Sequence, residues 1–203
     1  KTESGEYNFE YDPIQIYLEQ NIAGEGATRA TAGKGLKFDD AYREDLYQSI
    51  ASVKNKVNLR ISKMSEVSQK WFANTISTVG SIPDGVRWIC QQLMLALTKQ
   101  YGANGSSVEF TVSHFLFDMY FCPGIINPGA YHMIDSKKKL SRKVVKNLHE
   151  IANLVKRSLT QTLFHQDRAR WMSEANGIIE HQEKNSLLWI RDVVKLDLHL
   201  SEK

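Results

Sequence analysis

Apolar residues in the central part of the chain recur at spacings of about three and four positions, and this period constrains the fold more than any other feature. Side chains at these spacings share one side of an α-helix, so the pattern predicts a long amphipathic helix. Asp39 is a suitable N-cap, and the helix is expected to reach about Val79. The intervening basic residues predict a solvated face. The apolar series is Leu46, Ile50, Val53, Val57, Ile61, Met64, Val67 and Trp71, and the basic series is Lys54, Lys56, Arg60, Lys63 and Lys70.

Start signals elsewhere predict further helices, and no segment shows the sustained two-residue alternation that is typical of strands. Pro13 and the pair Pro83 and Asp84 suit first helical turns, and Ser106 with Glu109 matches a capping box. We therefore expect an all-α fold, a bundle of five or more helices of which several are long. The other expected starts are Asp135 or Ser136, for a helix through Leu140 and Val155, and about Ser173, for a helix ending near Leu196.

Two prolines, Pro123 and Pro128, bracket a short apolar segment that follows a predicted helix. Because a proline cannot donate a backbone hydrogen bond, the helix is predicted to stop near Phe121. The residue before each proline is expected to be extended. Residues 117–128 are thus predicted to be an apolar helix end that runs into a stiff, mostly apolar loop, which serves either as a buried corner or as a contact surface.

The length of 203 residues suits one domain with a sizeable core, and we assign residues 1–203 to a single domain. Glycines and small residues predict a flexible loop at about 21–38. Within it, Gly33-Lys34-Gly35 lacks the Gly-Lys-Ser/Thr ending of a phosphate loop, so a plain loop is the preferred interpretation. The chain begins with neither an initiator methionine nor an apolar signal-peptide core, and we interpret it as an excised domain.

Composition argues against several classes of function. The net charge of +3 is too small to indicate nucleic-acid binding, and no apolar run is long enough to span a membrane. Cys90 and Cys122 lie in apolar helical surroundings, which predicts buried free thiols in a reducing compartment. The six histidines lack the pairing of a zinc site, and no nucleophile elbow or dinucleotide turn occurs. We therefore expect no metal, no cofactor, no catalytic residue and no substrate pocket of the chain's own.

Several segments resemble the Ras GTPase-activating (RasGAP) domains, and together they cover most of the chain. Phe117–Ile125 is similar to the family signature Phe-Leu-Arg-x-x-x-Pro-Ala-Ile. Ile82–Ile89 resembles a helix start of the family, and its Ile-Pro-x-Gly form looks most like the IQGAP scaffold proteins. Residues 12–17, 127–135 and 147–155 fit as well. The resemblance implies the carboxyl-side portion of a RasGAP-like helical bundle.

Two departures from the family pattern bear on mechanism. RasGAP domains carry a catalytic arginine in a finger loop upstream of the segment that matches Asp12-Pro13, so the finger is expected outside this chain. Arg29 lies on the wrong side of that segment and is not assigned the role. The signature arginine, which steadies the finger loop, aligns with Met119, and Asp118 stands where leucine is usual. Because methionine cannot donate the hydrogen bonds of an arginine fork, both departures count against GTPase activation.

The resemblance implies two sets of site residues. Asn153 matches an asparagine that faces the GTPase in the family, although helix capping or packing explains it equally well. The basic residues Arg142, Lys143 and Lys146 are placed near the binding groove, where they meet acidic switch residues or simply form a solvated face. The candidate GTPase-binding residues are Met119, Asn127, Arg142, Lys146 and Asn153, and the structural signature comprises Arg87, Phe117, Cys122, Pro123, Ile125 and Pro128.

IQGAP proteins bind Rac and Cdc42 in the GTP form and lack effective activation. The resemblance therefore implies a domain that binds a small GTPase of the Ras or Rho type, with its GTP and magnesium, without strong GTPase activation. It also implies a cytoplasmic scaffold near the cell cortex or cytoskeleton, with cytoskeletal proteins bound through other domains. Two alternatives remain open. One is an active Ras-family activator whose finger lies upstream, and the other is a helical assembly module that binds no GTPase.

Overall fold

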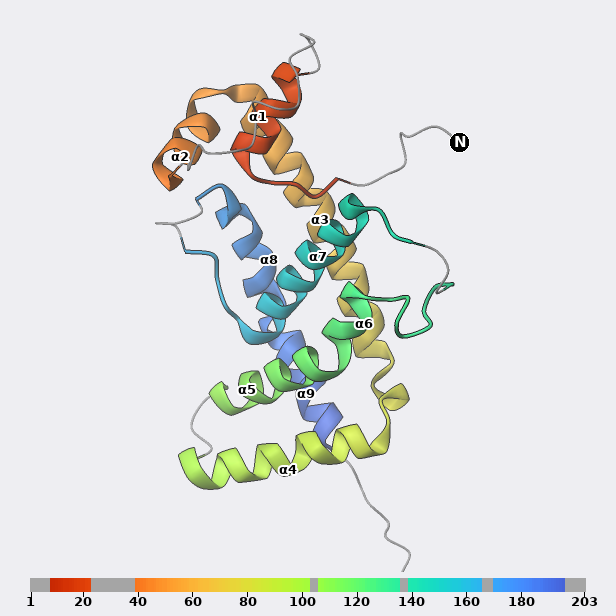
Figure 1. The fold of residues 1–203 in the computed structure, drawn as a ribbon. Coiled ribbons are helices and arrows are strands. Elements are labelled where there is room, and N and C mark those ends of the chain that lie inside the picture. The colour runs from red at the N-terminus through yellow and green to blue at the C-terminus, as the bar shows by residue number, and fades with distance from the viewer. Residues whose placement is uncertain (1–7, 23–38, 103–105, 136–138, 166–169, 196–203) are drawn as a thin grey trace, which may run out of the picture.

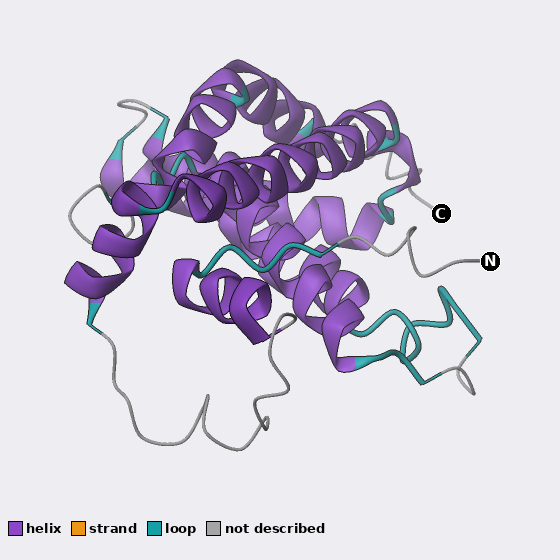
Figure 2. Ribbon diagram, turned by 90° about the horizontal axis from the view of Figure 1, so that it is seen from above, coloured by secondary structure: helices purple, strands orange, loops and turns teal. Residues whose placement is uncertain are grey.

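A computed structural model describes residues 8–22, 39–102, 106–135, 139–165 and 170–195, and every regular element within these ranges is helical (Figure 1, Figure 2). The all-α class is therefore confirmed. Arg29 and Gly33-Lys34-Gly35 lie outside the described residues, as does most of the loop expected at 21–38.

Two long helices, α3 (Ala51–Ser77) and α7 (Arg142–Thr160), run through the middle of the bundle. In Figure 1, α1 and α2 lie near one end of α3, while α4, α5 and α9 gather near its other end. The other elements are α1 (Pro13–Ile22), α2 (Asp40–Ser49), η2 (Val79–Ser81), α4 (Asp84–Tyr101), α5 (Ser107–Leu116), η3 (Phe117–Phe121), α6 (Cys122–Ile126), η4 (Arg170–Ala175), α8 (Asn176–His181) and α9 (Glu183–Val194).

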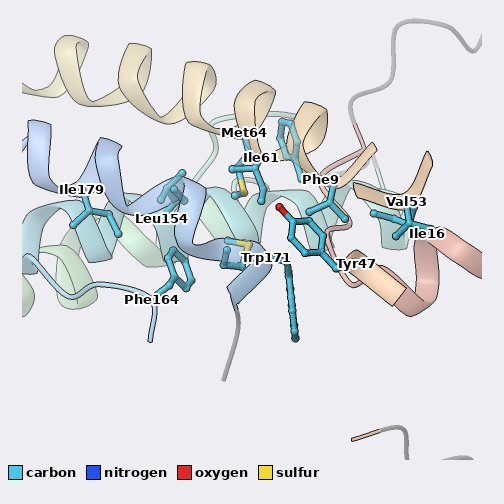
Figure 3. Close-up of a cluster of buried hydrophobic side chains, with 13 residues drawn as sticks. Phe9, Ile16, Tyr47, Val53, Ile61, Met64, Leu154, Phe164, Trp171 and Ile179 are labelled. Atoms are coloured by element: carbon cyan, nitrogen blue, oxygen red, sulfur yellow. The ribbon is translucent and has the colours of Figure 1, made fainter. Parts of the chain in front are cut away.

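The buried apolar side chains form two clusters, one toward each end of the molecule. The first joins α1, α2, α3, α7 and the η4–α8 segment, and Figure 3 shows Ile61, Leu154 and Trp171 within it. The second joins the end of α3 to α4, α5, α6, α7 and α9 around the buried Phe117 and Trp189. Ile151 of α7 packs against both clusters, so α7 connects the two halves of the core.

The helix predicted from Asp39 to about Val79 is two helices in the structure. Asp39 does cap the first, because its carboxylate accepts a hydrogen bond from the Tyr42 N–H at 2.9 Å. The break falls at Ile50, which is extended with φ −113° and ψ 100°. This bend lets both α2 and α3 pack on α1. The apolar period runs through the bend without a gap, so the spacing alone indicated one helix.

The prediction that Arg60 lies on a solvated face is wrong. Arg60 is only 7% exposed, and its guanidinium donates to the Glu10 carbonyl at 2.9 Å and to the Glu19 carboxylate at 2.6 Å. One acceptor, the Glu10 carbonyl, comes from the residues that precede α1, and the other, the Glu19 carboxylate, comes from α1 itself. A buried guanidinium is tolerated where its donors are bonded in this way.

The helix predicted to stop near Phe121 instead continues to Ile126. The chain winds through η3, a π-helical turn in which the Cys122 N–H bonds to the Phe117 carbonyl, and then through α6. Cys122 is helical with φ −56° and ψ −45°, although it precedes Pro123. A proline ring ordinarily clashes with the carbonyl four residues earlier, and the wider π-turn, which Pro123 directly follows, relieves that crowding.

Helix α1 begins at Pro13, as predicted, and α4 begins at Asp84, with Pro83 as its N-cap residue and not in its first turn. The capping box before α5 is not formed, because the Ser106 side chain makes no capping bond within the described part of the chain. The Glu109 carboxylate instead accepts a hydrogen bond from Arg191 of α9 at 3.1 Å. This tertiary ion pair draws Glu109 away from the N-cap.

Helix α7 begins after Ser141 and not at Asp135 or Ser136, of which Ser136 lies outside the described residues. The Ser141 hydroxyl accepts a hydrogen bond from the Val144 N–H at 3.3 Å and so takes the capping role. The sequence offered several polar residues in this region, and the chain uses the last of them.

The final helix is predicted from about Ser173 to Leu196, of which Leu196 lies outside the described residues. Up to Lys195 the chain forms three shorter elements, namely η4, α8 and α9. Asn176 at the η4–α8 junction bonds the Phe164 backbone in both directions, at 2.8 and 3.0 Å. The Ser186 hydroxyl donates to the Ser158 carbonyl of α7 at 2.9 Å. These bonds hold the segment against α7. A single straight helix could not make all of them.

Candidate functional site

The candidate binding residues on α7 share its outward side. Positions 142, 146, 149 and 153 recur at helical spacing and therefore point in similar directions. Arg142, Lys146 and His149 are exposed, and Asn153 is half-buried. In Figure 1, α6 lies beside α7, and the two helices pack directly.

Met119 lies in the π-helical turn between α5 and α6. Its side chain is 68% exposed, whereas Phe117 is fully buried and meets Trp71 edge-on with ring centroids 6.1 Å apart. π-turns occur frequently at functional sites, where the extra residue changes the direction of the side chains. The position at which the family signature has its arginine thus carries an exposed apolar side chain.

Asp118 links the π-turn to α7. Its Oδ2 atom lies 2.9 Å from Lys156 Nζ and 2.9 Å from His114 Nε2. Burial, followed by the charge of Asp118, raises the pKa of the half-buried Cys122 thiol. The Asp118 carboxylate therefore pairs with side chains of the domain itself, and its ion pair with Lys156 fixes the neighbouring Met119 relative to α7.

Asn127 follows α6 and lines a pocket of about 530 Å³ that extends to the start of α7. Its backbone N–H bonds to the Pro123 carbonyl, and the Met133 N–H bonds to the Pro128 carbonyl. The pocket is mostly apolar, with one lysine. Its other lining residues are Ile126, Gly129, Ala130, Ile134, Lys139, Leu140 and Val145.

Residues 8–12, which we call the strap, lie across α7 and cover part of the side that carries the candidate binding residues. The Phe9 N–H donates to Asn147 Oδ1 at 2.9 Å, and Glu10 forms an ion pair with Lys146. Tyr11 hydrogen-bonds the Glu150 carboxyl, whose pKa is raised by burial. The charge of Lys146 is thus compensated within the domain.

Asn153 has a partner on its own helix. Its Oδ1 accepts a hydrogen bond from Arg157 Nε at 3.3 Å. Arg157 also bonds the Thr162 and Leu163 carbonyls and stacks over the Phe164 ring at 4.1 Å. Asn153 therefore helps to orient an arginine that binds the chain after α7, and the residue as a whole is half-buried.

The residues of the structural signature occupy different places. Arg87 of α4 donates to the carbonyls of Val193, Asp192 and Lys195, at 3.0, 3.1 and 2.7 Å, and so covers the C-terminal end of α9. Such bonds satisfy carbonyls that a helix end leaves unpaired. Phe117 lies in the second core cluster, against which Cys122 and Ile125 pack, while Pro123 and Pro128 are half-buried.

We define the α6–α7 face as the surface formed by Met119, Asn127, Arg142, Lys146 and Asn153. Its members come from η3, the residue after α6, and α7, and α6 packs against both η3 and α7. Arg87 and Phe117 lie away from it, in the helix packing. Sequence reasoning missed three residues that shape this face: Glu10, Lys156 and Asp118 in its pairing role. The only available signal was their charge, which does not identify partners.

The described ranges contain potential metal ligands and both cysteine thiols. No group of three or more His, Cys, Asp or Glu residues there is arranged to hold a metal ion. Burial raises the pKa of the Cys90 thiol to about 11, which disfavours the nucleophilic thiolate. None of the described helices is both long and apolar enough to cross a membrane.

A family model described as GTPase-activator protein for Ras-like GTPase, the RasGAP model, matches residues 2–159. The chain belongs to the RasGAP family. The matched range contains the whole α6–α7 face, while η4, α8 and α9 lie beyond it.

Curated relatives agree with this assignment. The Ras GTPase-activating-like protein gapA of Dictyostelium discoideum is 25% identical over 194 residues, which are 93% of this chain and 21% of gapA. The Ras GTPase-activating-like protein IQGAP2 of Mus musculus is 22% identical over 172 residues, 83% of this chain and 11% of IQGAP2. The chain thus spans about a fifth or less of the length of these relatives. The RasGAP resemblance, with an IQGAP protein among the relatives, is confirmed.

Proposed function

We propose that the α6–α7 face binds a small GTPase of the Ras or Rho type in its GTP and magnesium form. We further propose that binding regulates the GTPase without strongly accelerating hydrolysis. The observation that carries this proposal is Met119, an exposed thioether at the place of the signature arginine. A methionine offers apolar contact area and adaptable packing, but it cannot donate a hydrogen bond.

The chemistry of the face supports contact with a protein surface. Met119 supplies apolar area, and Asn127 and Asn153 supply amides. Arg142 and Lys146 lie on the exposed side of α7. Because Glu10 compensates Lys146, charge on this face contributes more to steering than to affinity. An acidic switch region around the bound nucleotide is a suitable partner for such a surface.

Weak activation follows from what activation requires. A GTPase activator stabilises charge that develops on the phosphates with an arginine finger, which contributes roughly 10³ to 10⁵ in rate. The signature arginine that would steady such a finger is replaced by Met119. A cytoplasmic scaffold role, with cytoskeletal partners bound by other parts of a longer protein, belongs to the same proposal.

Two matched substitutions of exposed apolar residues test the face. Met119→Asp places a carboxylate at the centre of the proposed contact, while Leu95→Asp does the same on α4, where Leu95 is 58% exposed. With a GTP-loaded GTPase that binds the unaltered protein, we expect Met119→Asp to weaken binding about tenfold or more and Leu95→Asp to leave it unchanged. Equal effects of the two variants would remove the α6–α7 face from the proposal.

GTPase activation is the second candidate function. It is favoured by the family model, which describes a GTPase activator, and by relatives named Ras GTPase-activating-like. Single-turnover GTP hydrolysis, with and without the protein, separates the two functions. Acceleration by a factor of roughly 10³ or more would establish activation.

A further inference from the structure

A second pocket lies between α3 and the η4–α8 segment, and it shares no residue with the α6–α7 face. Its volume is about 430 Å³, within the range of roughly 300–1,000 Å³ that is usual for small-molecule sites. It is lined by Asn58, Ile61, Ser62, Ser65, Glu66 and Gln69 of α3, by Glu174 of η4 and by Ile178 of α8.

The α3 wall of this pocket is a polar stripe. Asn58, Ser62, Ser65 and Gln69 recur at steps of four, three and four, and so share one side of the helix. A polar helix side usually faces water. Here η4 packs against α3 and places Glu174 opposite the stripe, which turns a solvated side into the wall of a pocket.

Ser65 is the unusual member of the stripe. It is only 4% exposed, and its Oγ finds no hydrogen-bond partner among the described residues. Buried serines elsewhere in these helices donate to the carbonyl four residues earlier, as Ser68 does to Met64 and Ser158 does to Leu154. Ser65 does not make this bond. Buried hydroxyls without a partner are rare in proteins, so this one indicates a missing hydrogen-bonding group.

The charges and apolar side chains that line the pocket indicate which kind of ligand group would bond to Ser65. Glu66 and Glu174 lie on different elements, and Glu66 already pairs with Lys70 at 2.6 Å. Asn58, which accepts a hydrogen bond from the Tyr47 hydroxyl at 2.9 Å, lines the same pocket as Glu174. Burial, and then the charges of Glu174 and Glu44, raise the pKa of Tyr47, which agrees with this placement. Ile61 and Ile178 add apolar walls that suit methylene groups.

We propose that this pocket binds an alkylammonium group, with Glu174 as its principal counter-ion. The Ser65 hydroxyl accepts a hydrogen bond from the ammonium, and Ile61 and Ile178 contact the alkyl chain. An ammonium carries three donors and no acceptor, which matches a pocket rich in oxygen atoms. This chemistry is supplied either by a free polyamine or by a lysine side chain of a bound protein.

Calorimetric titration tests the proposal with two probes, spermidine and a short glycine-rich peptide that contains one lysine. We expect saturable binding of at least one probe, and the probe that binds identifies the source of the ammonium. Glu174→Gln should weaken binding about tenfold or more, because a charge-assisted hydrogen bond is lost. Glu180→Gln removes the same charge from an exposed site on α8 outside the pocket and should leave the affinity unchanged.

Ser65→Ala provides a second variant that a folding defect does not confound. It removes the unpartnered hydroxyl without adding volume, so the melting temperature should not fall while the affinity for the probe does. Saturable binding of neither probe would overturn the proposal. Equal weakening by Glu174→Gln and Glu180→Gln would overturn it too, because the attraction would then be a property of the net charge. GTPase binding is measured separately and involves a different surface.

Discussion

Arg60, Glu19, Glu10 and Lys146 form a connected group of charges that joins three helices. Arg60 bonds the Glu10 backbone and the Glu19 carboxylate, while the Glu10 side chain pairs with Lys146. Although burial opposes it, the hydrogen bond and charge of Arg60 lower the pKa of Glu19. One short strap thus connects α1, α3 and α7 through single side chains.

Replacing Arg60 with alanine should destabilise the domain by about 2 kcal/mol, because two bonds made by a buried guanidinium are lost. Lys63→Ala removes a lysine from an exposed position on the same helix and should change stability by no more than about 0.5 kcal/mol. Urea unfolding measures both values. Equal small effects would mean that the bonds of Arg60 are not stabilising.

The half-buried Glu150 makes stability depend on pH. Burial raises its pKa in the folded state, so the folded protein holds the proton more tightly than the unfolded chain does. Stability from this group is therefore present below the unfolded pKa of about 4.3 and is lost as pH rises through the folded pKa. Gln at this position can still accept the Tyr11 hydrogen bond. We expect Glu150→Gln to equal the unaltered protein near that lower pH and to be more stable at neutral pH, as measured by thermal unfolding. A neutral-pH loss of stability would contradict this.

The positions of single side chains on their helices followed from the sequence better than their partners did. The resemblance identified Met119 and Lys146, but the pairs Lys156–Asp118 and Lys146–Glu10 were not foreseen. The second joins residues 136 positions apart, and only the fold brings such residues together. Arg60 was misplaced for the same reason, since its acceptors come from Glu10 of the strap and from Glu19 of α1, which lie 50 and 41 positions away in the sequence.

At the scale of elements, the π-turn between α5 and α6 sets the geometry of the candidate site. Phe121 packs edge-on against Trp71 at 5.6 Å and lies 5.9 Å from Trp189, so α3 and α9 hold the turn from inside. The outward residues, including Met119, are thereby presented beside α7. Local rules about proline predicted a stop, because a π-turn is stabilised by this tertiary packing and has no clear local signal.

Helices begin at the residues that the local sequence favours, unless a tertiary hydrogen bond uses the capping side chain. Pro13, Asp39 and Asp84 act as the sequence indicated, whereas Glu109 is drawn to Arg191. The break at Ile50 does not interrupt the spacing of the apolar residues, so that spacing could not predict it. The type of the elements was therefore predictable, while several of their boundaries depended on contacts between elements.

The cap of α7 offers a matched test at this scale. Ser141 accepts a hydrogen bond from the Val144 N–H, whereas the Ser106 side chain makes no capping bond among the described residues. Ser141→Ala should therefore cost about 1 kcal/mol and Ser106→Ala clearly less. Chemical denaturation of the two variants gives the comparison. A larger loss for Ser106→Ala would show that the capping box forms in solution.

For the whole molecule, the main structural consequence is that two core clusters share helices. Both α3 and α7 contribute to each cluster, and Ile151 packs against both. If the helices around one cluster unfolded, the shared helices would lose their packing and expose apolar side chains of the other cluster as well. The assignment of the chain to a single domain remains a prediction that the following experiment addresses.

Ile16→Ala in the first cluster and Ile190→Ala in the second should each cost about 2–5 kcal/mol, because both side chains are fully buried. We expect one shared unfolding transition in both variants, seen alike by circular dichroism and by tryptophan fluorescence. Two separated transitions, or a variant that affects only one probe, would show that the halves unfold independently.

Function at this scale depends on whether the domain recognises the nucleotide state of a GTPase. The direct measurement is binding to a panel of Ras, Rac, Cdc42 and Rab proteins in GTP-like and GDP states, with GTP hydrolysis followed in the same samples. We expect selective binding of the GTP-like state of a Ras or Rho type protein with little change in the hydrolysis rate. Strong acceleration, or no binding to any member of the panel, would contradict the proposed function.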